Sequence, residues 1–212
     1  ADFESAAKIT TAFEKVGLVG AVGHIERFNP AFLAFLKTSP NPSFIESHRL
    51  CSFNERGLDV DVVLDLMIHD IDLCLVLVGS KLKKISAFGS PILTSSIDIA
   101  NARLEFANNT TVNLTASRIS LKQMRQMRIF QKRSYSVIDF QKPELNTWQI
   151  NKKGSLSNKK PPLINTNALF EELSSFVMSI NNNTPVIIGA EEGLNALLVA
   201  SKIQQKIEEQ NK

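Results

Sequence analysis

The residues best suited to chemistry lie in one apolar stretch, 59–79, which reads DVDVVLDLMIHDIDLCLVLVG. The stretch is long enough for a helix of about five turns. At about 100° per residue, one side of that helix would carry three carboxyl groups and an imidazole. These belong to Asp61, Asp65, Asp72 and His69, whereas Asp70 lies on a different face. Because burial of unpaired carboxylates is costly, this acidic stripe is expected to face a wet cavity, a ligand or fixed partners.

Asp65 and His69 are the pair within the stripe that could transfer a proton. They are four residues apart, so both side chains project from the same side of a helix, one turn apart. A neighbouring carboxylate orients an imidazole and favours its protonated form, which suits proton exchange with a hydroxyl or carbonyl group. From spacing alone, His69 could equally sit in a structural polar seam with Asp65 or Asp72. A zinc or manganese site is also conceivable, but His24 and His48 are isolated in the sequence and no metal site is predicted.

Composition limits the class of protein. The chain has 212 residues, 43% hydrophobic and 21% charged, which suits a globular protein of one domain or one and a half. Its formal charge of +3 is small and dispersed, so no nucleic-acid partner is expected. The two cysteines are too few for a disulfide scaffold and fit a reducing compartment. With no signal peptide and no long charge-free apolar run, we expect a cytoplasmic protein that does not cross a membrane.

The pattern of apolar residues predicts an α+β fold. Helices are expected over 2–16, 31–38, 59–79, 167–181 and 190–208. Strands are expected over 18–23, 44–50, 83–92, 98–108, 110–120, 124–133, 134–141 and 146–150, with polar loops at 24–30 and 152–162. Gly17 and Gly79 would end helices, and Asn108-Asn109 would form a hairpin turn. We therefore expect a mainly antiparallel, mixed open sheet with helices on one face and a second copy of the chain against the other.

Two arginines are further candidates for ligand contact. Arg27 follows the first expected strand, where αβ sheets tend to bind ligands. An ion pair with Glu26 or Glu55 would explain it equally well. Arg118 ends an expected strand and could bind an anionic group through its fork of donors, or could be structural. The three glycines at 17, 20 and 23 do not form a phosphate loop, because a helix precedes the expected strand instead of following it.

Five segments taken together resemble the Gfo/Idh/MocA family of NAD(P)-dependent oxidoreductases. They are VGHIERFNPAF (22–32), DVVLDLMIHDIDL (61–73), DIANARLEF (98–106), LTASR (114–118) and PVIIGAEEGLNALLVA (185–200). The first segment is most similar to members that act on nucleotide sugars. The resemblance implies that residues 1–23 are the end of a Rossmann domain. Residues 24–212 would be the C-terminal domain for substrate binding and oligomerisation.

The resemblance also implies a mechanism, in which hydride passes between a sugar carbon and the nicotinamide of NAD or NADP. An Asp-x-x-x-His pair and a lysine handle the hydroxyl proton, and the pair corresponds to Asp65 and His69. Candidate substrate-binding residues are Arg27, Asn29, Asp72 and Arg118. The family's lysine and its glycine-rich loop would lie upstream of residue 1, so these 212 residues alone are expected to be inactive. The alternatives are a non-catalytic dimerisation or sugar-binding module, or a reductase of the same family with a non-nucleotide substrate.

Overall fold

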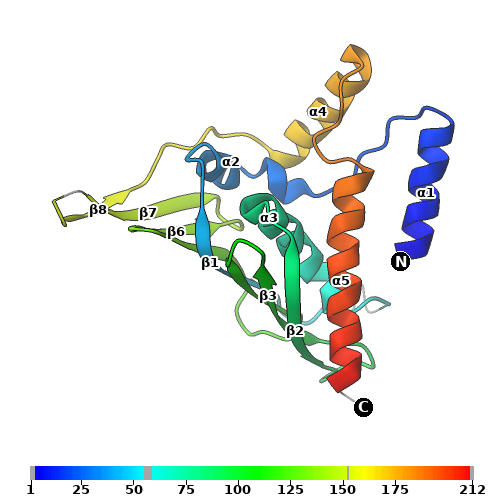
Figure 1. Ribbon diagram of the computed structural model, residues 1–212, viewed down its shortest axis with the longest axis horizontal. Helices are drawn as coiled ribbons and strands as arrows, with labels where there is room; N and C mark the ends of the chain where they lie inside the picture. The colour runs from blue at the N-terminus through cyan, green and yellow to red at the C-terminus, as the bar shows by residue number, and fades with distance from the viewer. Residues whose placement is uncertain (1–2, 55–58, 152, 211–212) are drawn as a thin grey trace.

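One eight-stranded sheet forms the frame of the computed structural model, which describes residues 3–54, 59–151 and 153–210 (Figure 1). The strands are β1 (Pro42–Leu50), β2 (Leu82–Ser90), β3 (Ile99–Phe106), β4 (Thr111–Ser117), β5 (Met124–Gln131), β6 (Ser134–Asp139), β7 (Glu144–Ile150) and β8 (Leu156–Lys159). Across the sheet they follow the order β2-β3-β4-β1-β5-β6-β7-β8. β1 pairs with β4 in parallel and with β5 antiparallel, and the remaining pairs are antiparallel. The predicted α+β class with a mixed, mainly antiparallel open sheet is confirmed.

Some of the helical segments begin or end at capping residues. They are α1 (Phe3–Lys15), η1 (Ile25–Phe28), α2 (Pro30–Leu36), η2 (Val63–Met67), α3 (Ile68–Val78), α4 (Ala168–Asn182) and α5 (Ala190–Gln210). Asn167 caps α4 by accepting from the backbone N–H groups of residues 169 and 170. Gly79 ends α3 in the left-handed conformation, at φ 54°, which costs glycine no Cβ clash. At the start of α5, Glu192 accepts from the Gly189 N–H, which is half of a capping box.

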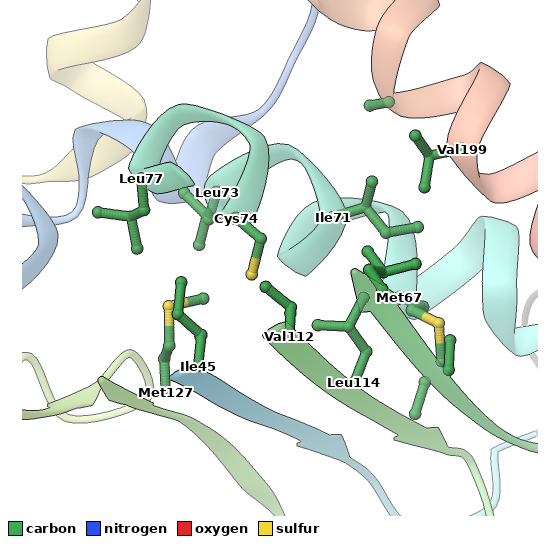
Figure 2. Close-up of a cluster of buried hydrophobic side chains, with 14 of the residues drawn as sticks. Ile45, Met67, Ile71, Leu73, Cys74, Leu77, Val112, Leu114, Met127 and Val199 are labelled. Carbon is green, nitrogen blue, oxygen red and sulfur yellow. The ribbon is translucent and has the colours of Figure 1, made fainter. Parts of the chain in front are cut away.

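The hydrophobic core lies between the sheet and helices α2, α3 and α5, all on the same face (Figure 1). Strand alternation sends every second side chain into it, as Ala100, Ala102 and Leu104 show in β3. In Figure 2, Cys74 of α3 points down between Ile45 and the neighbouring strand, in a fully buried cluster. Burial raises the pKa of the Cys74 thiol well above its ordinary value, so it is an inert packing residue. This packing fixes α3, and with it the candidate site, against the central strands.

The opposite face of the sheet carries a row of aromatic rings on neighbouring strands. Phe44, Phe130, Tyr135 and Trp148 are cross-strand partners in that order. Their successive ring centroids are 5.5, 4.7 and 5.5 Å apart. Rings at this spacing attract one another beyond their simple burial. Each ring is only half-buried, so the row leaves apolar surface on the face that the helices do not cover.

Four expected features differ in the structure. Residues 18–23 form no strand, because the described chain places no neighbouring strand beside them to complete a ladder. The expected loop 24–30 contains the short helix η1, and the expected loop 152–162 contains the exposed edge strand β8. The long helix begins at residue 62 instead of 59, and its first turns are π-helical. In the part of the chain that the structure describes, no helix is both long and apolar enough to cross a bilayer.

Candidate active site

A π-helical segment opens the helix that carries the predicted acidic stripe. η2 covers Val63–Met67 and α3 continues from Ile68. A π-turn advances by about five residues per hydrogen bond instead of four, which rotates the preceding residues relative to those that follow. Asp61 therefore leaves the stripe and caps the helix, accepting from the N–H groups of Val63 and Leu64 at 2.9 and 3.1 Å. The predicted single stripe is wrong.

The expected contact between Asp65 and His69 is also wrong. Asp65 is exposed, and its charge acts on the thiol of Cys51 instead. His69 is mostly buried, and Nδ1 has no hydrogen-bond partner among the described residues. The electrostatic neighbours of His69 belong to other elements and to the next turns of its own helix: Arg49, His24, Asp70 and Asp72.

His69 is consequently a neutral imidazole. Burial lowers its pKa to about 4, and positive charge on Arg49 and on His24 adds to the decrease. The carboxylates of Asp70 and Asp72 oppose the decrease without cancelling it. The prediction that a carboxylate neighbour would favour the protonated ring is therefore wrong, because desolvation outweighs it. At neutral pH the ring has one N–H donor and one free acceptor nitrogen.

Asp72 and Arg27, both predicted to bind substrate, are instead bound to each other. The Arg27 Nε and Nη2 atoms donate to the two carboxylate oxygens of Asp72 at 2.7 and 2.5 Å. The Asp72 side chain is 1% exposed and that of Arg27 13% exposed. This bidentate pair ties η1 to α3 and satisfies the buried carboxylate. It also replaces the ion pair with Glu26 or Glu55 that the sequence left open for Arg27; Glu55 lies outside the described residues.

A second buried ion pair, which the sequence did not reveal, runs parallel to the first. Arg49 of β1 donates through Nη2 to Asp70 at 2.9 Å and through Nη1 to Glu26 at 3.2 Å. Burial opposes the charge of Arg49, but the two carboxylates overcome it and raise the pKa of the guanidinium. Asp70 and Asp72 thus point to different partners, as expected for residues two apart on a helix. Together the two pairs clamp η1, β1 and α3 around His69.

The remaining two predicted substrate-binding residues have protein partners in the structure, and their contact with a substrate stays a prediction. The Asn29 side chain is buried; its Oδ1 caps α2 at the Ala31 N–H and its Nδ2 donates to the Phe140 carbonyl at 3.3 Å. Arg118 is also buried, and it donates to the Val60 carbonyl at 2.5 Å. Its Nε lies 3.8 Å from the carboxylate of Asp98. Arg118 therefore supports the segment that leads into η2, and neither residue offers a free group to a ligand through these atoms.

Asp98 anchors the loop beside Arg118. Burial raises its pKa, but the opposing hydrogen bonds from the N–H groups of residues 92–94 and from the Thr94 hydroxyl lower the pKa to about 2. Such a nest of donors holds a carboxylate ionised. Here the protein's own side chain fills the nest, so the loop is not a ligand site.

His24 is the site residue that sequence reasoning missed. Its ring lies edge-to-face with that of His69, with centroids 5.7 Å apart and an interplanar angle of 86°. It is 5% exposed, and neither of its ring nitrogens has a hydrogen-bond partner among the described residues. Burial lowers its pKa, although the nearby Asp72 raises it in part. The sequence feature that could have identified His24 is its position directly after residues 18–23 and three residues before Arg27.

His24 also lines a cavity of about 770 Å³. The walls come from α1, from residues 18–22, and from the segment that leads into α5, and most of them are apolar. Ile68 of α3 lies on the same cavity, immediately before His69. The neutral imidazole of His24 thus lines an apolar cavity, and that of His69 lies edge-to-face behind it. A ring nitrogen that faces the cavity can accept a proton from a hydroxyl group, or an N–H can polarise a carbonyl group.

Comparison with known proteins shows the family and the fold of the chain. Residues 20–134 match the family model described as the GFO/IDH/MocA C-terminal domain. A curated relative, UDP-N-acetylglucosamine 3-dehydrogenase of Acidithiobacillus ferrooxidans, is 33% identical over 217 aligned positions that cover 98% of this chain and 68% of the relative. A solved structure of that enzyme superposes with a TM-score of 0.90 at 32% identity, over 98% of this chain and 68% of its own.

More distant structures share the fold alone. An aldose-aldose oxidoreductase from Caulobacter crescentus has a TM-score of 0.85 at 17% identity, over 98% of this chain and 67% of its own. An oxidoreductase domain protein from Kribbella flavida has a TM-score of 0.87 at 13% identity, over 99% and 70%. The resemblance that the five sequence segments indicated is confirmed.

Proposed function

The chain belongs to the Gfo/Idh/MocA family, and we propose that it is the substrate-binding and catalytic-helix portion of an NAD(P)-dependent oxidoreductase that acts on a nucleotide sugar. The name of the curated relative supports the substrate class. The observation that carries the proposal is His69, a mostly buried, neutral imidazole whose Nδ1 has no partner among the described residues. It lies on a helix fixed by two ion pairs and contacts His24, which lines a cavity. The acceptor nitrogen of a neutral ring can take a hydrogen bond, and then a proton, from a substrate hydroxyl group.

The residues present fit the reacting end of a nicotinamide cofactor. His24, which contacts His69, lines a mostly apolar cavity, and both rings have nitrogens without partners among the described residues. Such a cavity suits a flat ring and a sugar carbon. When bound, NAD or NADP would accept or supply the hydride. The described residues offer no glycine-rich turn between a strand and a helix for the phosphates. We therefore propose that residues 1–23 end a dinucleotide-binding domain and that residues 24–212 form the substrate domain.

The chain's own contribution is proton transfer and positioning. Neutral His69 would accept the hydroxyl proton as the sugar carbon is oxidised, and would return it in the reverse direction. Arg27 and Asp72 neutralise one another, so their contribution is to hold η1 against α3. Asp65, exposed and without contact to His69, would touch the sugar instead of orienting the ring.

Turnover by the full-length protein tests this proposal. Purified enzyme is mixed with NAD or NADP and UDP-N-acetylglucosamine, and reduced nicotinamide is followed by absorbance. A matched panel of UDP-sugars and free polyols separates nucleotide-sugar enzymes from other reductases. Reduction of cofactor with UDP-sugars alone supports the proposal, and turnover confined to free polyols contradicts the substrate class.

We also propose that the aromatic row on the open sheet face pairs with a second copy of the chain. The half-buried rings of Phe44, Phe130, Tyr135 and Trp148 support this, because a contiguous apolar row on an otherwise polar surface marks an interaction face. In sedimentation experiments Tyr135→Glu should convert a dimer to a monomer. Leu121→Glu, at a fully exposed position, is the control. An unchanged dimer in Tyr135→Glu would place the interface elsewhere.

A further inference from the structure

Among the described side chains that line the cavity, His24 is buried and has polar atoms whose role the fold does not explain. At 5% exposure both of its ring nitrogens lack a partner. A buried polar atom without a hydrogen bond is costly, and native structures keep few of them without a functional reason. The buried charged groups described around α3 are paired, whereas both nitrogens of His24 and Nδ1 of His69 are unsatisfied, and these nitrogens point to a ligand.

The backbone holds this ring firmly in place. The Val22 N–H donates to the Ile188 carbonyl at 3.0 Å, and the His24 carbonyl accepts from the Arg27 N–H at 3.0 Å as η1 begins. Gly193 of α5 packs so close to Val22 that an added Cβ would lie 2.7 Å from a valine methyl carbon. The segment before His24 is therefore fixed against α5, and the segment after it is fixed against α3. A preorganised side chain of this kind suits ligand recognition.

The surroundings of the ring indicate which nitrogen faces which group. Nε2 lies 3.9 Å from Asp72 Oδ1, which is too long for a hydrogen bond but brings that edge of the ring to a carboxylate. Such a neighbour favours the tautomer with the proton on Nε2. Nδ1 then carries the lone pair and is the atom available to a ligand hydroxyl group.

Charge around the cavity limits the ligand group that His24 can meet. The nearest guanidinium, that of Arg27, is neutralised by both oxygens of Asp72. Glu191 and Glu192 also line the cavity. An anionic phosphate would meet carboxylates there, with no lysine or arginine among the described residues that line the cavity, whereas an uncharged hydroxyl or carbonyl oxygen would meet a neutral imidazole.

We propose that His24 is a second ligand-contacting imidazole, which hydrogen-bonds an uncharged oxygen of the sugar next to the group that His69 serves. This inference rests on the proposed function, because it takes the sugar as the ligand. It follows from the edge-to-face contact with His69, the position of His24 on the cavity and its unpartnered nitrogens. His24 then helps select and orient the sugar, while His69 exchanges the proton.

Kinetics of the full-length enzyme test the contact. His24→Phe keeps the packing but removes the hydrogen bond, and should lower kcat/KM for UDP-N-acetylglucosamine about 10- to 100-fold. His24→Asn keeps an acceptor and should recover part of the loss. Lys202→Asn, at an exposed position of α5 outside the cavity lining, is the control and should leave kcat/KM unchanged. Equal kcat/KM in His24→Phe and the unaltered enzyme overturns the proposal, as does an equal loss in both His24 variants.

A second measurement does not depend on turnover. The chain contains three histidines, so ¹⁵N-histidine labelling of the 212 residues gives three assignable imidazoles. Added UDP-N-acetylglucosamine should move the Nδ1 resonance of His24 and leave that of His48 in place. A stationary His24 signal while that of His69 moves overturns the proposal and leaves the proposed function standing. If the unaltered enzyme shows no turnover, the proposed function fails, and the imidazole signals still decide whether this ligand reaches His24.

Discussion

Two kinds of buried polar group surround α3, and they differ in whether they have hydrogen-bond or ion-pair partners. The charged groups are paired: Asp72 with Arg27, and Asp70 with Arg49, which also binds Glu26. The imidazoles of His24 and His69 touch each other but leave three ring nitrogens without partners among the described residues. The ion pairs are costly charges made tolerable by geometry, so they fix the structure. The imidazoles are neutral and unsatisfied, so they remain available for chemistry.

The comparison shows that burial of a charged residue does not by itself identify a site. Arg27, Asn29, Asp72 and Arg118 have the residue types that bind ligands, yet these side chains bind the protein itself. His24 had no such pattern in the sequence and is the more informative residue. The four predictions below separate the paired groups from the unpaired ones, beginning with the largest expected effect.

Loss of the His69 imidazole should remove activity without removing stability. In the full-length enzyme His69→Asn should lower turnover about 10²- to 10⁴-fold, since it removes an acid-base group. The free energy of unfolding should stay within about 1 kcal/mol, because the ring nitrogen that is lost had no partner. Steady-state kinetics and urea denaturation measure the two quantities. Normal turnover in this variant would exclude His69 as the proton-transfer group.

Loss of the Arg49 guanidinium should instead lower the stability of the fold. Arg49→Met leaves the carboxylate of Asp70 buried without its cation and removes the nearer cation of Glu26, which should lower the free energy of unfolding by about 3–5 kcal/mol. Arg128→Met is the control, because Arg128 binds Glu46 at 3.2 Å on the sheet face without helices and should cost under about 1 kcal/mol. Urea titrations measure both variants. An equal loss in the free energy of unfolding in the two variants would show that burial does not increase the contribution of the ion pair.

Acid should destabilise the fold through the imidazoles. Burial, with the charges of Arg49 and His24, lowers the pKa of His69 to about 4, whereas an unfolded chain titrates near about 6.5. Between these values the unfolded state binds more protons, so the free energy of unfolding falls as pH falls from 6.5 to 4. The loss approaches about 3 kcal/mol for this one group. Denaturation at several pH values should give a flatter slope in His69→Asn than in His48→Asn, and equal slopes would contradict the assignment.

The smallest change in stability should come from substitution of Asp61, which caps the helix and does not belong to the predicted stripe. Asp61→Ala removes the bonds to the N–H groups of Val63 and Leu64 and to Gln204. Loss of a helix cap costs about 1 kcal/mol, and turnover should be unchanged. Thermal unfolding and the nicotinamide assay measure these outcomes. A large fall in turnover without a loss of stability would show that Asp61 belongs to the active site.

Local patterns in the sequence were enough to predict most elements. The alternation in 98–106 identified β3, Gly79 marked the end of α3, and Asn109 takes the left-handed turn expected of it, at φ 66°. These features depend on neighbours within a few residues, and those are visible in the sequence. The strand expected at 18–23 failed because strand formation depends on a partner, which local pattern does not supply.

The site was less predictable because its geometry depends on distant segments. A helical wheel assumes 3.6 residues per turn, so it could not anticipate the π-helical turn that separates Asp61 and Asp65 from His69. The partner of Asp70 comes from β1 and that of Asp72 from η1, and the positions of both elements follow from tertiary packing. His24 reaches His69 for the same reason. Residue type identified His69, whereas its partners required the fold.

The parallel pairing of β1 with β4 has a consequence for how the chain acquires its fold. β1 is made first among the strands, yet its place in the sheet is between β4 and β5, after α3 and two further strands have followed it. β2, β3 and β4 can assemble from local hairpin contacts, but β1 must wait for β4 and close a long loop. Until then Ile45 and Arg49, which later pack against α3 and its carboxylates, have no partners. We expect closure of this loop to limit the folding rate and to be the step most exposed to aggregation during synthesis.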